Sequence, residues 1–366
     1  MSVSASRILL IATRQIGDVL LVTPLLRSLR RAYPNAVIDV LVYANKGGML
    51  VGNPDYSELI SVSEHPRASE YFRLLSRIFR RYDLAISTLA GDRPLAYALL
   101  AAPVRVALVP APRWQDAWKR AFIQYKTTFD NLYTHTVTQN LKLADLLEIP
   151  RCYEMVVPTH SDDELSVDQA LPFAWREQAF VVLHLLPMWQ YKRWTLEGWT
   201  ALAQALHAQN LRVVLTGGNA PVEQEFLRQA LAVFPENTVN VAGKLAFSAV
   251  AKLLKTAKLY VGPDTAVTHL AAAVGVKTLA LYGPTNPLKW SPYPQGYARN
   301  YPPFEHKGTQ HVGNILLLQG EGDCVPCHEE GCDRHKQSDS RCLQELAAAR
   351  VITAALSLLS ETQLKE

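Results

Sequence analysis

The sequence predicts an α/β protein with two doubly wound domains, each containing a mostly parallel sheet that is covered by helices on both faces. Three observations lead to this prediction. Short apolar runs of strand length alternate with amphipathic helical stretches through the first half of the chain. A polar segment with prolines, residues 157–177, interrupts the alternation and is expected to be a linker. The alternation then restarts, and repeated β-α-β units are typical of a parallel sheet.

In the first half, runs rich in Ile, Leu and Val are followed by helical stretches, except that the run 37–43 leads directly to the next expected strand. The expected strands cover residues 7–12, 37–43, 59–62, 83–88 and 104–109, and the expected helices cover residues 16–33, 69–81, 94–100 and 131–147. The first of these helices carries Leu20, Leu21, Leu25 and Leu29 along one side. Such an apolar stripe indicates a helix that packs on the sheet.

The second half repeats this organisation. The expected strands cover residues 179–186, 212–216, 258–261 and 277–282, with a short strand at Val239, and the expected helices cover residues 196–209, 221–233 and 248–256. We therefore predict an N-terminal domain over residues 1–165, a second domain over 175–345, and a C-terminal helix over 346–366 that packs back on the first domain. In such sheets, ligands bind outside the carboxyl ends of the strands, so we expect a cleft between the two domains.

Composition supports a folded globular chain of two domains. Apolar residues make up 49% of the 366 residues and charged residues 19%. No apolar run approaches the roughly 20 residues of a membrane span, and the N-terminus lacks a signal-peptide pattern, so we expect a cytoplasmic protein. Residues 1–150 carry a net charge of +6, and the remainder a net charge of −2. A basic first half suits an anionic substrate or membrane surface, whereas no nucleic-acid-binding motif is present.

The first strand-to-helix turn places one carboxylate, Asp18, at the start of a helix. This turn has a single glycine, Gly17, and so lacks the G-x-G-x-x-G fingerprint of dinucleotide-binding proteins. The chain also has no P-loop. Asp18 therefore has two interpretations: a reactive carboxylate at the cleft, or a helix-start residue that is favoured by the helix dipole.

In the second half, polar and cationic residues follow several strands. Lys192 and Arg193 lie in a loop with two tryptophans after the strand 179–186, and such cations suit a diphosphate. The turns at Thr216-Gly217 and at Gly243 follow two further strands. Each turn alone is a weak indication because glycine is common in turns, but together they are consistent with a nucleotide lying across the strand ends.

Residues 260–273 are predicted to form a strand, a tight turn at Gly262 and Pro263, and then a helix. Asp264 is the expected N-cap, and Thr265 adds a second side-chain oxygen. His269 is spaced to lie on the same side of the helix as Thr265. A helix N-terminus carries free N–H groups and the positive end of the dipole, so this segment is a candidate phosphate site.

Four of the five cysteines fall within a short stretch. They are Cys324, Cys327, Cys332 and Cys342. In a cytoplasmic protein such a cluster favours metal binding over disulfides, although its spacing departs from the usual paired zinc pattern. A structural zinc and a set of reduced thiols are both consistent with it. A catalytic zinc is not expected, because four thiolates would leave no open coordination position.

Taken together, these motifs resemble the glycosyltransferases of family 9, which include the ADP-heptose–lipopolysaccharide heptosyltransferases. Residues 31–43 resemble most closely the heptosyltransferase III subgroup. The matching segments are residues 16–20 with Thr23-Pro24, Lys192 before Trp194, and residues 214–218, 241–243, 262–273 and 281–285. They follow the family's order over nearly the whole chain. One departure is Pro263, which stands where the family usually has a small residue.

The resemblance implies a GT-B fold of two Rossmann-like domains and an inverting, metal-independent transfer of heptose from ADP-heptose to the inner core of lipopolysaccharide. It implies that Asp18 is the general base and that Lys192 neutralises the departing diphosphate. It also implies that Asp264, Thr265 and His269 hold the donor, with Thr216, Gly217, Gly243 and Gly262 lining the nucleotide site. The acceptor's location implies contact with the cytoplasmic face of the inner membrane.

Two alternatives stay open. A nucleotide-sugar epimerase or isomerase could use the same fold with acid and base groups but no acceptor. A non-enzymatic, zinc-stabilised binding protein could use the basic first half. The donor base, the acceptor position and the oligomeric state do not follow from the sequence.

Overall fold

The computed structural model describes residues 4–361 and divides into two compact units. Unit 1 comprises residues 4–158 together with Ala298–Pro302, and unit 2 comprises residues 159–297 and 303–361. The division therefore falls at Pro158, within the segment that we expected to link the domains. No helix in the described range is long and apolar enough to cross a membrane.

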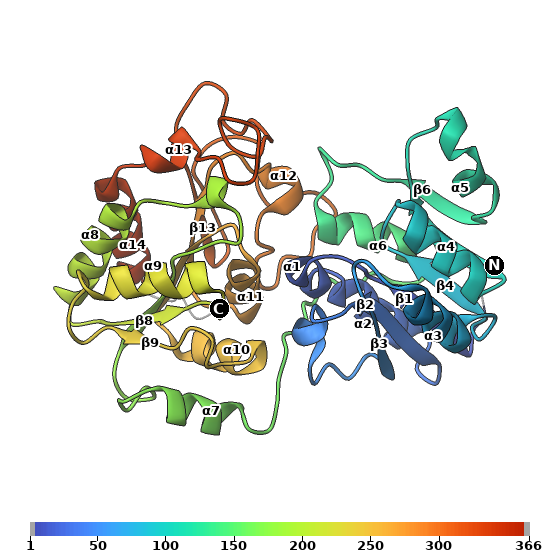
Figure 1. Cartoon of the computed structure of the whole chain (residues 1–366), viewed down its shortest axis with the longest axis horizontal. Helices are drawn as coiled ribbons and strands as arrows, with labels where there is room; N and C mark the ends of the chain where they lie inside the picture. The colour runs from blue at the N-terminus through green and yellow to red at the C-terminus, as the bar shows by residue number, and fades with distance from the viewer. Residues whose placement is uncertain (1–3, 362–366) are drawn as a thin grey trace. The chain divides into compact units, whose positions relative to one another are not determined.

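Unit 1 is a parallel sheet with helices on both faces, as the alternation predicted. Its strand order is β3-β2-β1-β4-β5-β6, and each neighbouring pair is parallel. The strands are β1 (Arg7–Ile11), β2 (Val37–Tyr43), β3 (Glu58–Val62), β4 (Leu84–Ser87), β5 (Val104–Val109) and β6 (Tyr125–Thr128), and the helices are α1 (Ile16–Leu20), α2 (Thr23–Ala32), α3 (Ala68–Ile78), α4 (Asp92–Ala101), α5 (Ala117–Ala121) and α6 (Thr136–Leu146). β1 lies inside the sheet, so its carboxyl end brings the turn before Asp18 to the sheet's edge (Figure 1).

Two helices of unit 1 differ from the expected ranges for local reasons. The single helix expected over 16–33 is divided into α1 and α2, and Pro24 stands in the first turn of α2. Proline is favoured there because it lacks the N–H that a helix interior requires. The helix expected from residue 131 begins at Thr136. The carboxylate of Asp130 accepts hydrogen bonds from the backbone N–H groups of Leu132 and Tyr133, which favours a turn instead.

Unit 2 has a larger sheet in the order β12-β13-β11-β10-β7-β8-β9, in which only the β12–β13 pair is antiparallel among the described strands. The strands are β7 (Phe180–His184), β8 (Arg212–Thr216), β9 (Val239–Asn240), β10 (Leu259–Pro263), β11 (Thr278–Tyr282), β12 (Gln310–Val312) and β13 (Ile315–Gln319). The helices are α7 (Asp163–Ala170), α8 (Leu196–His207), α9 (Pro221–Leu231), α10 (Phe247–Thr256), α11 (Ala266–Val274), α12 (Pro287–Trp290), α13 (Arg341–Gln344) and α14 (Ala348–Ser360). β12 and β13 were not among the expected strands, and neither was β6 of unit 1.

The expected linker contains a helix, α7, which packs on α10. Val167 of α7 is fully buried, and Glu164 pairs with Lys252 of α10. This helix was not predicted because the segment is polar, and a single buried valine does not produce an apolar stripe in the sequence.

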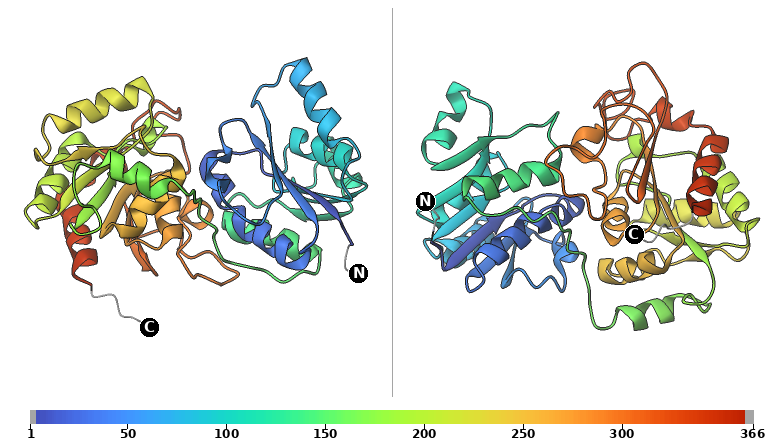
Figure 2. Two further views of the ribbon diagram at one scale, coloured as in Figure 1. Left: turned by 90° about the horizontal axis from the view of Figure 1, so that it is seen from below. Right: turned by 180° about the vertical axis from the view of Figure 1, so that it is seen from behind.

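The C-terminal helix α14 packs on unit 2, which corrects the expectation that it returns to the first domain. It lies against α8 and the strands β10, β11 and β13 (Figure 1 and Figure 2). Val351, Ala355 and Leu358 are buried in the same apolar cluster as Trp199 of α8. The Lys277 ammonium donates to the Leu358 carbonyl at 2.7 Å, which satisfies a backbone oxygen at the helix end.

Candidate functional site

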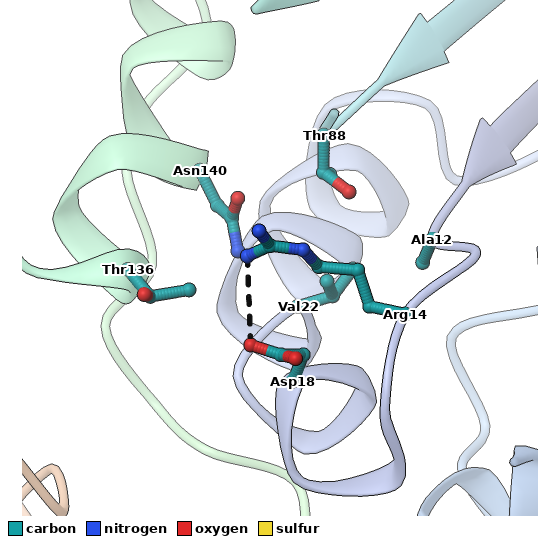
Figure 3. Close-up of a pocket in the computed structure, with 7 residues that line it drawn as sticks. All are labelled: Ala12, Arg14, Asp18, Val22, Thr88, Thr136 and Asn140. Carbon is teal, nitrogen blue, oxygen red and sulfur yellow. Dashed lines mark ion pairs between the residues drawn. The ribbon is translucent and has the colours of Figure 1, made fainter. Parts of the chain in front are cut away.

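In unit 1, Asp18 lines a small pocket at the carboxyl edge of the sheet. β1 ends at Ile11, the chain turns, and α1 begins at Ile16, so the first helical turn presents Asp18 beyond the strand. An Arg14 guanidinium nitrogen lies 3.6 Å from a carboxylate oxygen of Asp18. Figure 3 shows the Asp18 carboxylate paired with the Arg14 guanidinium, whose end lies beside the Asn140 amide of α6. A carboxylate, a guanidinium and an amide therefore converge here.

The pocket around Asp18 encloses about 10 Å³, roughly the room for one water molecule. Its wall is completed by Ala12, Val22, Thr88, Thr136 and Asn140 (Figure 3). The Thr88 hydroxyl donates to the Ile11 carbonyl at 3.0 Å, and the Asn140 amide donates to the Leu21 carbonyl at 3.2 Å. These bonds fix two polar walls of the pocket. Arg14, Thr88, Thr136 and Asn140 were not predicted as site residues, although Thr88 ends the expected strand 83–88 and could have been found from that position.

In unit 2, the Lys192 ammonium and the Asp264 carboxylate form an ion pair of 2.5 Å. Lys192 lies in the short 3₁₀ turn Gln190–Lys192 after β7, and Asp264 follows the neighbouring strand β10. Asp264 is buried and Lys192 is largely buried. The parallel pairing of β7 and β10 thus brings together two residues that sequence reasoning had assigned to one diphosphate site.

Asp264 is not the N-cap of α11, as we had expected. The strand β10 continues through Gly262 and Pro263, so these two residues do not form a tight turn. The N-cap is Thr265, whose hydroxyl accepts the hydrogen bond from the backbone N–H of Thr268. This leaves the Asp264 carboxylate available for Lys192.

Several groups surround the Asp264 carboxylate and determine its ionisation. Burial alone would raise the pKa of Asp264, but the charges of Lys192 and His269 and the hydrogen bonds from Lys192 and Thr285 lower it below its ordinary value. The His269 ring lies 3.9 Å from the carboxylate, and the Tyr282 hydroxyl donates to it at 3.4 Å. Asp264 is thus a fixed negative charge that holds a cation at the strand ends.

The glycine-containing turns after β8 and β9 lie next to each other. Gly243 has a φ of +73°, a left-handed conformation that favours glycine, and a side chain there would collide with the amide of Asn219. The backbone N–H of Gly243 donates to the Gly217 carbonyl at 2.8 Å. The side chain of Glu223 lies against Gly217 and Gly218, and burial raises its pKa.

Thr216 ends β8 and contacts a buried histidine that sequence reasoning missed. His184 Nδ1 and the Thr216 hydroxyl are 3.1 Å apart. Burial lowers the pKa of His184 to about 4, and a hydrogen bond with the backbone of Thr216 opposes this only in part. His184, Asn219 and Glu223 were not predicted as site residues, and no distinctive spacing marks them, whereas Tyr282 and Thr285 stand in the matching segment 281–285 without an assigned role.

The cysteine-rich segment lies in unit 2, between β13 and α14. Cys324 and Cys332 are exposed, whereas Cys327 and Cys342 are partly covered. Burial and the neighbouring thiols Cys327, Cys332 and Cys324 raise the pKa of Cys342 to about 12. Within residues 4–361, no group of three or more His, Cys, Asp or Glu side chains is arranged to hold a metal ion.

Comparisons with known proteins place this geometry in context. The model of the family described as "Glycosyltransferase family 9 (heptosyltransferase)" matches residues 78–316. The chain is 28% identical over 287 residues to lipopolysaccharide heptosyltransferase 3 of Escherichia coli, covering 76% of this chain and 83% of that protein. The fold is similar to a family 9 glycosyl transferase from Veillonella parvula, with a TM-score of 0.77, 20% identity and 99% of both chains covered. It is also similar to the E. coli ADP-heptose lipopolysaccharide heptosyltransferase II, with a TM-score of 0.72, 20% identity, and 96% and 98% of the chains covered.

Proposed function

This chain belongs to glycosyltransferase family 9, and on that basis we propose that it transfers a heptose from ADP-heptose to the inner core of lipopolysaccharide. The fold is GT-B, with a Rossmann-like domain in each unit. The observation that carries the proposal is the Lys192–Asp264 pair at the carboxyl ends of β7 and β10, next to the start of α11. A held cation beside helix N–H groups suits a diphosphate.

The proposed reaction is a direct displacement at the anomeric carbon. The acceptor hydroxyl loses its proton to the Asp18 carboxylate while its oxygen forms the new glycosidic bond. The bond between the anomeric carbon and the diphosphate oxygen breaks, and ADP leaves with the electron pair. The configuration at the anomeric carbon is thereby inverted. A positioned general base contributes typically about 10²–10⁴-fold to such a step.

Lys192 is proposed to stabilise the negative charge that develops on the leaving diphosphate. Its ammonium is already fixed by Asp264, so little reorganisation is needed when charge appears. Thr265 and His269 of α11 are proposed to bind the same diphosphate, and Thr216, Gly217, Gly243 and Gly262 are proposed to line the nucleotide site. This electrostatic stabilisation can operate without a metal ion, which is the expectation from the family resemblance.

Substitution of Asp18 tests the proposal. We expect Asp18→Asn to reduce heptose transfer to a truncated core acceptor by about 10²–10⁴-fold, because the amide cannot accept the proton. Asp92→Asn, which changes an exposed carboxylate of the same unit, is the matched control and should retain full activity. A folded Asp18→Asn variant with undiminished transfer would show that Asp18 is not the general base. Incubation with donor alone separates transfer from isomerisation, since a transferase leaves the sugar configuration of the donor unchanged.

The outer face of α3 is proposed to contact the inner membrane. Phe72 and Phe79 are 77% and 52% exposed, and Arg73, Arg77 and Arg80 are exposed beside them. The opposite side of the helix buries Leu74 and Ile78 in the core of unit 1. Exposed aromatic rings among arginines are typical of helices that lie in an anionic lipid interface.

The four clustered thiols are proposed to take up a structural zinc. The closeness of the thiols supports the proposal, since Cys324, Cys327 and Cys332 all lie near enough to Cys342 to act on its pKa, and the backbone N–H of Arg341 donates to the Cys332 sulfur at 3.4 Å. Because no three of these groups are arranged as ligands in the described residues, the segment would have to close around the ion and release the thiol protons. Thiolates are the preferred ligands of structural zinc. The metal would stabilise the segment and take no part in the transfer step.

A further inference from the structure

The loop that carries Lys192 is held on both sides by one distant segment of the chain. We refer to residues 189–193 as the lysine loop and to residues 336–344 as the brace. The Ser340 hydroxyl donates to the Tyr191 carbonyl at 2.7 Å, and the Gln344 amide donates to the Arg193 carbonyl at 3.0 Å. These two bonds fix the backbone on either side of Lys192.

The start of the lysine loop is held in the same way. The backbone N–H of Gln190 donates to the Lys336 carbonyl, and its side-chain amide donates to the Asp339 carboxylate, both at 3.1 Å. The Lys336 ammonium lies 4.5 Å from the centre of the Trp189 ring, within the range of a cation–π contact. Every residue of the loop other than Lys192 therefore contacts the brace, whereas Lys192 pairs with Asp264.

The brace is itself an ordered segment. Its Ser338 and Ser340 are buried. The Asp339 carbonyl accepts a hydrogen bond from the backbone N–H of Cys332 at 2.9 Å, and the Ser338 hydroxyl accepts one from the backbone N–H of Asp333 at 2.9 Å. Gly331, with a φ of +89°, lies close to the side chains of Ser338 and Tyr191. A rigid segment of this kind can fix a flexible lysine-bearing loop.

We propose that Ser340 and Gln344 are positioning residues that keep the Lys192 ammonium at the place where the donor diphosphate departs. This inference rests on the proposed function of Lys192. The brace belongs to the cysteine-rich part of the chain, which thereby gains a role in the transfer step. None of the bonds described above between the brace and the lysine loop involves a thiol. Without the brace, the loop has fewer restraints and the ammonium loses its preorganisation.

The test is a double substitution examined alone and together with Lys192→Ala. We expect Ser340→Ala/Gln344→Ala to lower kcat about tenfold with a smaller change in donor KM, because the ammonium acts chiefly in the transition state. In the Lys192→Ala background the same double substitution should have no further effect on kcat. Ser166→Ala, which removes a hydroxyl bond to the Asp162 carbonyl elsewhere in unit 2, is the matched control and should match wild type.

Hydrogen exchange provides a readout that does not depend on the reaction. The amides of the lysine loop should exchange at least about tenfold faster in Ser340→Ala/Gln344→Ala than in Ser166→Ala. Unchanged exchange, or an equal additional loss of kcat in the Lys192→Ala background, would overturn the positioning role. If Lys192→Ala alone retains full transfer, the proposed function of Lys192 fails, and the exchange measurement still decides whether the brace orders the loop.

Discussion

The ammonium of Lys192 and the carboxylate of Asp264 lie 2.5 Å apart although 72 positions separate them in the sequence. The pairing arises because each residue follows a strand, and the two strands β7 and β10 are parallel neighbours. Parallel strands present their carboxyl ends at one edge, so a residue after one strand meets a residue after the next. The site is thus a product of topology and not of local sequence.

Removing one member of this pair should destabilise the protein. In Lys192→Ala, the buried Asp264 carboxylate loses its ion-pair partner, and we expect the free energy of unfolding to fall by about 3 kcal/mol. Urea denaturation without nucleotide measures the change. Lys255→Ala, an exposed lysine of the same unit, should have almost no effect. A double-mutant cycle with Asp264→Ala that gave no coupling energy would contradict the importance of the pair.

His184 should make the stability of the protein fall in mildly acidic solution. Its pKa is lowered to about 4, whereas a histidine in the unfolded chain titrates near 6.5. Between these values the unfolded state binds the proton and the folded state does not, so the free energy of unfolding decreases as the pH falls. The loss attributable to His184 is about 3 kcal/mol by pH 4.

Urea titrations at pH 7, 6 and 5 check this expectation. His184→Asn removes the titrating group and should flatten the pH dependence relative to wild type. His207→Asn, which replaces an exposed histidine of unit 2, should keep the wild-type slope. Parallel curves for wild type and His184→Asn would show that this histidine does not contribute.

The outer face of α3 should bind anionic vesicles. We expect wild type to sediment with vesicles containing phosphatidylglycerol, and Phe72→Ser/Phe79→Ser to bind at least about tenfold more weakly, because interfacial binding scales with buried apolar area. Binding should weaken as the salt concentration rises, since the arginines act through screened charges. Trp114→Ser replaces another exposed aromatic residue of unit 1 and should bind as wild type does. If Phe72→Ser/Phe79→Ser binds the vesicles as tightly as wild type does, the outer face of α3 is not the membrane contact.

The cysteine cluster should carry about one zinc ion per chain in protein purified without chelators. Elemental analysis measures the content, and Cys324→Ser/Cys327→Ser should abolish it because two of the four ligands are lost. Cys152→Ala changes a buried thiol of unit 1 and should leave the metal content unaltered. Metal-free wild type with four titratable thiols would contradict the zinc proposal. Transfer activity should persist after brief chelation, since the reaction itself is expected to need no metal.

The strands were the most predictable part of this fold. β1 and β7 are continuous apolar runs because both faces of a parallel strand are buried, and such runs are conspicuous in a sequence. β12 was missed because Gln310 and Val312 are only partly buried and His311 is exposed, whereas β13, Ile315–Gln319, is an apolar run that could have been recognised. α7 was missed because its stability comes from packing on α10, which no local pattern records.

The candidate site was predictable only where a residue has a characteristic chemical neighbourhood in the sequence. Lys192 stands in a cationic, aromatic loop, and Asp264 precedes a helix start, so both were identified. The predicted capping role of Asp264 was wrong, since Thr265 and not Asp264 caps α11. Two adjacent polar residues can each cap a helix, and the pairing of Asp264 with Lys192, which is distant in sequence, is not visible in the local pattern. Arg14, Asn140 and His184 became visible only through contacts between elements.

The packing of α14 has a consequence for the order in which this chain can fold during synthesis. Unit 1 has all six of its strands within residues 7–128, which leave the ribosome early. The core of unit 2, by contrast, is completed by Leu343, Val351 and Leu358, which emerge long after the helix α8 and the strand β10 against which α14 packs. Until then, the apolar face of the sheet under α14 is open to water and to other nascent chains. Unit 2 is therefore the part of the molecule whose apolar surface stays exposed longest during synthesis, and a truncation within α14 should produce aggregates that contain a folded unit 1.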